Sequence, residues 1–98
     1  MSTIIDLAIF PMDKGASVSA YVARAAAVIA ESGLAYTTGP MGTSIEGEWE
    51  AVMAVVSRCM AELQKDSGRI YATLKIDYRK GVQGRLEGKL ASLTRHRP

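Results

Sequence analysis

The chain has 98 residues, of which 48% are hydrophobic and 22% are charged, and its formal net charge is +2. This length fits one domain, and the composition is that of a soluble globular protein with a buried core, which excludes a disordered chain. The longest apolar run, residues 25–30, is too short to span a bilayer, and residues 1–6 lack the basic start of a secretory signal. A single cysteine cannot form an internal disulfide, which fits a reducing compartment, so we expect a cytoplasmic protein. We expect one domain, over residues 1–98.

The elements expected in the first half of the chain begin with a strand over residues 3–10, where apolar residues occupy both faces and Pro11 ends the pattern. A helix follows to about Ser32, with Ser17 or Ser19 as its N-cap, because its apolar residues recur at helical spacing. Gly33 then suits the position after the helix. Residues 34–38 read as a second strand, and Gly39-Pro40 turns the chain into a third at about 41–45.

The second half begins with a helix predicted at about 48–65. Residues 69–79 are the clearest strand, because apolar and polar side chains alternate along them. Leu86, Leu90 and Leu93 have the spacing of a short terminal helix.

This order, β-α-β-β-α-β plus a helix, predicts an α+β fold of the ferredoxin-like kind, with an antiparallel four-stranded sheet and both helices on one face. The other face is left uncovered. It would display Asp6, Ala8, Phe10, Ser44, Glu46, Tyr71, Thr73 and Lys75. This mixture is too apolar for a purely solvated surface, so we expect the face to bind a ligand or a second subunit, and the protein to form a homo-oligomer.

Charge is distributed unevenly along the chain. Residues 1–57 carry two basic and six acidic side chains, a net charge of −4, whereas residues 58–98 carry ten and four, a net charge of +6. Either these charges interleave within one folded domain, or they meet between subunits, since opposite patches favour association. A total of +2 is weak for nucleic-acid binding, and we expect none.

The segment from Pro40 to Trp49 concentrates the candidate binding groups. Thr43 and Glu46 have the spacing of a capping box, in which both side chains would bind the start of the second helix. If the third strand instead continues to Glu46, its carboxylate lies on the uncovered face and can accept hydrogen bonds from an amino-heterocycle. Trp49 suits either a core anchor or a stacking platform.

Catalytic and metal-binding patterns are poor. Cys59 falls on the apolar stripe of the second helix, which indicates a core residue. His96 is the single histidine and stands three residues from the end, so no nucleophile–histidine pair or metal-ligand spacing is convincing. Ser17 and Ser19 suit helix caps or hydroxyl contacts to a ligand, and no phosphate-binding glycine pattern occurs. We expect no enzyme, cofactor or metal.

Several segments resemble the signatures of one known family. They are Pro11 with residues 15–23, then 31–36, 40–48, 77–79 and 86–93. Together they cover nearly the whole chain, and the stretch Pro-Met-Gly-Thr-Ser-Ile-Glu-Gly-Glu over 40–48 is fairly specific. The chain is similar to the small thiamine-binding, YkoF-like proteins.

The resemblance implies a ferredoxin-like fold assembled as dimers or tetramers. It also implies non-catalytic binding of thiamine or its hydroxymethylpyrimidine part, in thiamine salvage or transport. Carried over position by position, the ligand-binding residues are Ser17, Ser19, Met41, Thr43 and Glu46, with Glu46 the partner of the aminopyrimidine. Residues 12–14, Met-Asp-Lys, are bulkier and more charged than the family pattern, which would either narrow the pocket or change the ligand.

The alternative function is a structural or regulatory homo-oligomer that has no small ligand. In that case Ser17, Thr43 and Glu46 only cap helices. RNA binding is disfavoured because the third strand lacks the aromatic signature of RNA-recognition modules and carries an acid instead.

Overall fold

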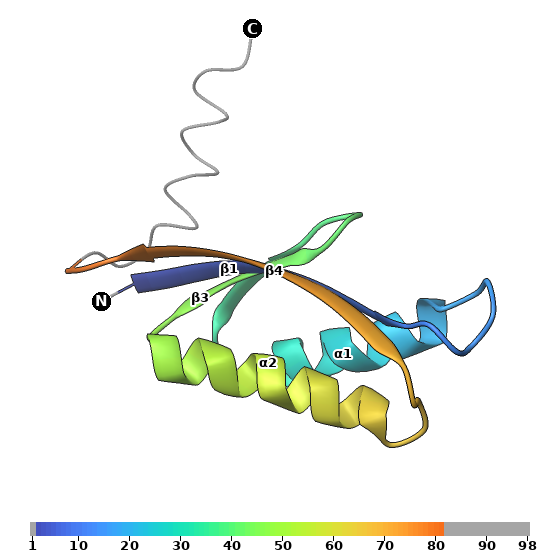
Figure 1. Cartoon of the computed structure of the whole chain (residues 1–98). Helices are drawn as coiled ribbons and strands as arrows, with labels where there is room; N and C mark the ends of the chain where they lie inside the picture. Colours follow the sequence, from blue (N-terminus) through green and yellow to red (C-terminus); the bar gives the residue numbers. More distant parts are fainter. Residues whose placement is uncertain (1, 82–98) are drawn as a thin grey trace, which may run out of the picture.

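The computed structural model describes residues 2–81, which form four strands and two helices in the predicted order β-α-β-β-α-β (Figure 1). The elements are β1 (Ser2–Pro11), α1 (Ser19–Glu31), β2 (Ala35–Thr38), β3 (Thr43–Gly47), α2 (Trp49–Gln64) and β4 (Ile70–Arg79). The predicted terminal helix at Leu86–Leu93 lies outside the described residues. Neither α1 nor α2 is long and apolar enough to cross a membrane.

The strands form one antiparallel sheet in the order β2-β3-β1-β4. β4 pairs with β1 along its whole length, from Ser2 to Pro11, whereas β3 pairs only from Thr3 to Leu7. Among residues 2–81, β1 therefore has a neighbouring strand on one side only beyond Leu7. Both helices lie on the same face of the sheet (Figure 1), so this part of the chain is an α+β fold with one helix-covered face.

The core lies between the helices and the covered face of the sheet. It consists of Ile5, Leu7, Ile9, Ala25, Ile29, Ile45, Val52, Val55, Cys59 and Leu63. The alternation predicted for β1 and the apolar stripe predicted for the second helix are confirmed, because both supply these buried residues. Cys59 is a core residue as predicted: its side chain is fully buried, its Sγ lies 3.6 Å from the Ala25 carbonyl oxygen, and burial raises the pKa of the thiol to about 11.

The predicted serine cap of the first helix is wrong. Val18 occupies the N-cap position of α1 without any side-chain cap, and its carbonyl accepts the N–H groups of Tyr21 and Val22. Ser19 is already the first helical residue, so its hydroxyl cannot reach forward as an N-cap does. The other end agrees with the sequence, since Gly33 follows the helix with a φ of +80°, a conformation that favours glycine.

The capping box at the start of the second helix is also wrong. Thr43 and Glu46 belong to β3, and α2 begins at Trp49 with Glu48 at the N-cap and no side-chain cap. Gly47 permits close packing at the end of this strand, because a Cβ atom on it would lie only 3.2 Å from Leu34 Cδ2 and 3.3 Å from Val52 Cγ2. Trp49 is 42% exposed and is not a core anchor.

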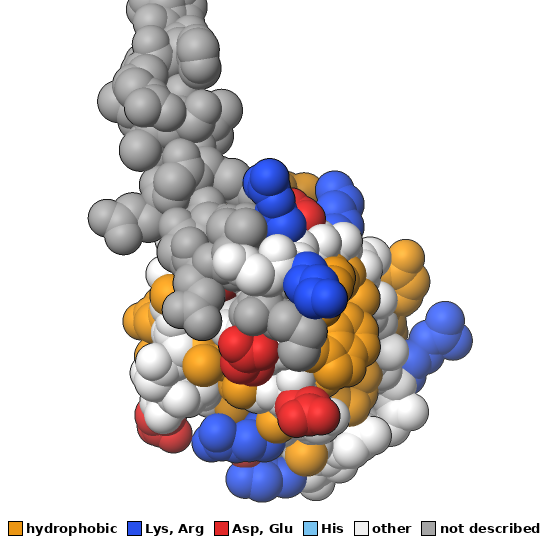
Figure 2. Space-filling model, turned by 90° about the vertical axis from the view of Figure 1, so that its left-hand side faces the viewer, with side chains coloured by type: hydrophobic (Ala, Val, Ile, Leu, Met, Phe, Trp, Pro, Cys, Tyr) orange, Lys and Arg blue, Asp and Glu red, His pale blue; other side chains and the backbone are white. Residues whose placement is uncertain are grey.

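Charges from the two halves of the sequence meet within one chain. Arg24 of α1 forms ion pairs with Glu62 of α2 and with Asp66 just beyond it, with N···O distances of 3.2 and 3.0 Å. Figure 2 shows one face of the molecule on which basic, acidic and hydrophobic side chains lie among one another. These pairs join minority charges of the two halves, so interleaving of the excess charges inside the domain stays a prediction.

Candidate functional site

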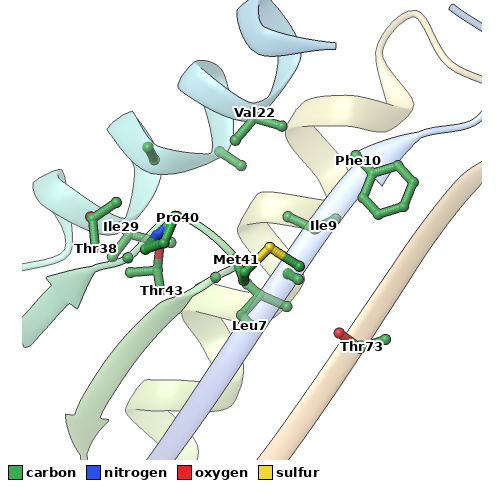
Figure 3. Close-up of a pocket in the computed structure, with 15 residues that line it drawn as sticks. Leu7, Ile9, Phe10, Val22, Ile29, Thr38, Pro40, Met41, Thr43 and Thr73 are labelled. Atoms are coloured by element: carbon green, nitrogen blue, oxygen red, sulfur yellow. The ribbon is translucent and has the colours of Figure 1, made fainter. Parts of the chain in front are cut away.

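A cavity of about 450 Å³ lies where β1 lacks its second neighbour (Figure 3). Its walls are residues 7–10 of β1, the inner side of α1, the turn between β2 and β3, and Thr73 of β4. Residues from both faces of β1 take part: Leu7 and Ile9 point towards the helices, while Ala8 and Phe10 belong to the other face. The cavity therefore wraps around the free edge of the strand.

The turn between β2 and β3 closes this cavity on one side. The Gly39 N–H donates to the Gly42 carbonyl oxygen at 2.8 Å, which fixes the turn directly after the last strand pair, Thr38 with Thr43. Because β3 starts opposite Leu7, the turn lies beside β1 and leaves a space there instead of adding a strand. Figure 3 shows Met41 extending from this turn towards β1.

The walls of the cavity are mostly apolar. Val22 and Ile29 face it from α1, and Phe10 lies at one end, with its ring 5.7 Å from that of Tyr71. Met41 is 85% exposed and forms part of the rim with a flexible, polarisable side chain. Polar groups are few, as in most small-molecule sites, and come chiefly from the threonines at positions 38, 43 and 73.

A carboxylate, that of Asp6, lies against the turn that closes the cavity, although Asp6 is not among the residues that line the cavity. Asp6 lies on the same face of β1 as Ala8 and Phe10, and it pairs with Ser44 of β3. A Cβ atom on Gly42 would lie 3.1 Å from both carboxylate oxygens of Asp6 and 3.1 Å from the Leu7 carbonyl oxygen. The turn can therefore contact this carboxylate only because residue 42 is glycine. The sequence placed Asp6 on the uncovered face but did not identify it as a binding residue.

Glu46 lies in β3 on the face of the sheet opposite to the two helices, as the strand interpretation predicted. Its Cα pairs with Ile4 of β1, and its Oε2 accepts a 2.6 Å hydrogen bond from the Ser2 hydroxyl. The residue is only 8% exposed, and Ser2 is 1% exposed. Glu46 is not among the residues that line the cavity.

Of the five residues predicted to bind a ligand, two line the cavity and three do not. Met41 and Thr43 line the cavity together, with Thr43 buried and Met41 on the rim. Ser17 and Ser19 are exposed at the start of α1 and do not line it. Ser17, Ser19 and Glu46 remain predicted contacts.

Residues 12–14 do not narrow this cavity, contrary to the expectation from their size, because none of them lines it. Asp13 instead joins two loops: its carboxylate accepts hydrogen bonds from the Ser67 hydroxyl at 2.5 Å and from the Gly68 N–H at 2.8 Å. These bonds hold the pKa of Asp13 below its ordinary value. Among residues 2–81, no group of three His, Cys, Asp or Glu side chains is placed to hold a metal ion.

Comparison with known families and relatives bears on this site. The family model described as "Thiamine-binding protein" matches residues 5–94. A UPF0045 protein of Mycobacterium tuberculosis, MT1949, is 35% identical over 97 residues, covering 98% of this chain and 95% of the relative. The UPF0045 protein MJ1052 of Methanocaldococcus jannaschii is 33% identical over 90 residues, covering 92% and 90%.

Solved structures share the same architecture. The structure of MJ1052 has a TM-score of 0.86 at 32% identity and covers 95% of this chain and 96% of its own. A Thermotoga maritima protein, whose name provisionally assigns it to thiamine biosynthesis or salvage, has a TM-score of 0.83 at 26% identity and covers 94% and 98%. The match extends over nearly all of each chain.

Proposed function

The chain belongs to the thiamine-binding protein family, and we propose that it binds thiamine or the hydroxymethylpyrimidine part of thiamine in the cavity beside the β2–β3 turn. Binding is non-catalytic and serves thiamine salvage or transport in the cytoplasm. The observation that carries the proposal is the cavity itself, because its lining contains Met41 and Thr43, two of the residues that the family resemblance assigned to the ligand.

The chemistry of the cavity suits this ligand class. Its volume of about 450 Å³ lies within the roughly 300–1,000 Å³ of typical small-molecule sites. Thiamine consists of two methyl-bearing aromatic rings, and these match walls made of Val22, Ile29 and Phe10. Its positive charge is attracted by an aromatic face, which Phe10 of the lining supplies.

Calorimetric titration with thiamine tests the proposal. Val22→Trp should abolish binding, because an indole at this lining position would fill the space between α1 and the turn. Ala23→Trp is the matched control, since Ala23 is the next residue of the same helix, is exposed and does not line the cavity. Absence of heat with both thiamine and hydroxymethylpyrimidine, or equal binding by Val22→Trp and the wild type, would contradict the proposal.

The family resemblance also supports a ferredoxin-like assignment and assembly into dimers or tetramers. The uncovered face favours self-association, since it carries the Phe10–Tyr71 ring pair and Tyr71 is 51% exposed. β4 adds a ten-residue strand at the edge of the sheet. A structural or regulatory homo-oligomer without a small ligand is therefore the second candidate. Light scattering should then give a dimer or larger species while calorimetry detects no ligand.

A further inference from the structure

We propose that the free edge of β1 at Ile9 is the hydrogen-bonding element of this cavity, and that the backbone N–H and C=O of Ile9 bind the aminopyrimidine edge of the ligand. The ring nitrogen next to the amino group accepts from the Ile9 N–H, and the amino group donates to the Ile9 carbonyl oxygen. This inference rests on the proposed function and deepens it, because it names the protein atoms that recognise an amino-substituted nitrogen heterocycle.

Two contacts fix the direction of the backbone groups along β1. Met12 directly follows β1, and its N–H donates to the Arg69 carbonyl oxygen at 2.7 Å, in the same register that pairs β1 with β4. Both backbone groups of a strand residue point to one side and those of the next residue to the other, so the even-numbered residues of β1 bond to β4. In agreement, the Leu7 carbonyl oxygen lies on the opposite side, 3.1 Å from the place of a Cβ atom on Gly42. The backbone groups of the odd-numbered residues therefore point away from β4.

Ile9 is the odd-numbered residue at which this edge of β1 is open. The pairing with β3 ends at Leu7, opposite Thr43, whereas Ile9 lies two residues further along β1 and lines the cavity (Figure 3). Among residues 2–81, no backbone or side-chain group forms a hydrogen bond with the N–H or C=O of Ile9. Ile9 is only 6% exposed, and buried backbone groups are nearly always paired. This donor and this acceptor are therefore available to a ligand in the cavity.

This pair of backbone groups selects the kind of ligand. A strand residue offers one donor and one acceptor side by side, and a planar ring matches them when a ring nitrogen stands next to an amino group, as in aminopyrimidine. The hydroxyls of Thr38, Thr43 and Thr73 can rotate to donate or to accept, so they do not impose such a pattern. The remaining wall is mostly apolar, which strengthens a hydrogen bond that is made there and penalises one that is left unmade.

Ile9→Pro and Ile9→Val form the matched pair of variants for the test. Proline removes the N–H that points away from β4 but no hydrogen bond of the sheet, so the variant should fold. Valine is of similar size and keeps the N–H, so it controls for the loss of core packing. In calorimetric titrations with thiamine and with hydroxymethylpyrimidine, Ile9→Pro should bind both about 3- to 10-fold more weakly than Ile9→Val, as expected for one neutral hydrogen bond. Equal affinities in the two variants would overturn the role of Ile9 while leaving the proposed function standing.

Amide hydrogen exchange of the wild-type protein, followed by NMR, keeps the inference testable if Ile9→Pro does not fold. Without ligand, the Ile9 N–H should exchange faster than those of Ala8 and Phe10, which point towards β4. Saturation with hydroxymethylpyrimidine should slow the exchange of Ile9 by a larger factor than that of its two neighbours. An unchanged exchange rate at Ile9, in protein that calorimetry shows to bind the ligand, would overturn this inference alone. Failure of the wild type to bind either ligand would overturn the proposed function as well.

Discussion

The guanidinium of Arg24 on α1 donates two hydrogen bonds of 3.0 Å from one nitrogen to both carboxylate oxygens of Asp66, beyond the end of α2. A further nitrogen donates to the Glu62 carbonyl oxygen at 2.7 Å. One side chain thus joins the two helices that cover the sheet. It also satisfies a backbone carbonyl in the last turn of α2, where such groups lack partners within the helix.

Arg24→Ala should lower the thermal midpoint of unfolding more than Arg58→Ala does. Arg24 makes contacts across two helices, whereas Arg58 is an exposed residue within α2. Differential scanning calorimetry of both variants measures the difference. Equal midpoints would mean that the Arg24 contacts are as weak as ordinary surface ion pairs.

The free energy of unfolding should fall on acidification, because the carboxylates that pair with Arg24 become protonated. Hydrogen bonds from Lys65 and Arg24 hold the pKa of Glu62 below its ordinary 4.5, and Arg24 holds the pKa of Asp66 below 3.8. A carboxyl whose pKa is lower in the folded state stabilises that state above its unfolded pKa and loses this contribution as the pH falls through the folded pKa. Urea unfolding at a series of pH values below 4.5 should show the loss. In Arg24→Ala the decline should be shallower, and a decline of equal slope in both proteins would contradict this origin.

Cys59 should be inert towards thiol reagents in the folded protein. The thiolate is the reactive form, and burial raises the pKa of this thiol to about 11, so at neutral pH it is protonated as well as inaccessible. Ellman's reagent should react slowly with native protein and completely in denaturant. Rapid reaction with the native protein would show that α2 opens away from the sheet.

Glu46→Ala should reduce stability more than it reduces ligand affinity. The substitution removes an acceptor of the Ser2 hydroxyl, which is 1% exposed, and loss of such a buried bond costs about 1–3 kcal/mol. Because Glu46 does not line the cavity, thiamine affinity should change little. Chemical unfolding and calorimetry on the same preparations compare the two effects. A larger loss of affinity in Glu46→Ala would instead support the contact carried over from the family resemblance.

Local patterns in the sequence predicted most of the fold. Alternation of apolar residues identified the long strands, and helical spacing identified α1 and α2, because these periods follow directly from backbone geometry. The glycine after α1 and the buried Cys59 were predicted on the same grounds. The serine cap predicted for α1 was wrong, since a hydroxyl near a helix start does not fix which residue begins the helix. Of the two alternatives for Thr43 and Glu46, the strand is correct and the capping box is not.

The sequence by itself determined the apolar faces of β1 and α2 that form most of the core, because side-chain periodicity reveals them. It also marked Met41 and Thr43 as binding residues by resemblance. The tertiary structure alone decided where the cavity lies. β3 stops opposite Leu7, and the turn then brings Gly42 against Asp6, a residue 36 positions earlier. Such a contact depends on strand register and on the path of a turn, which no local pattern specifies.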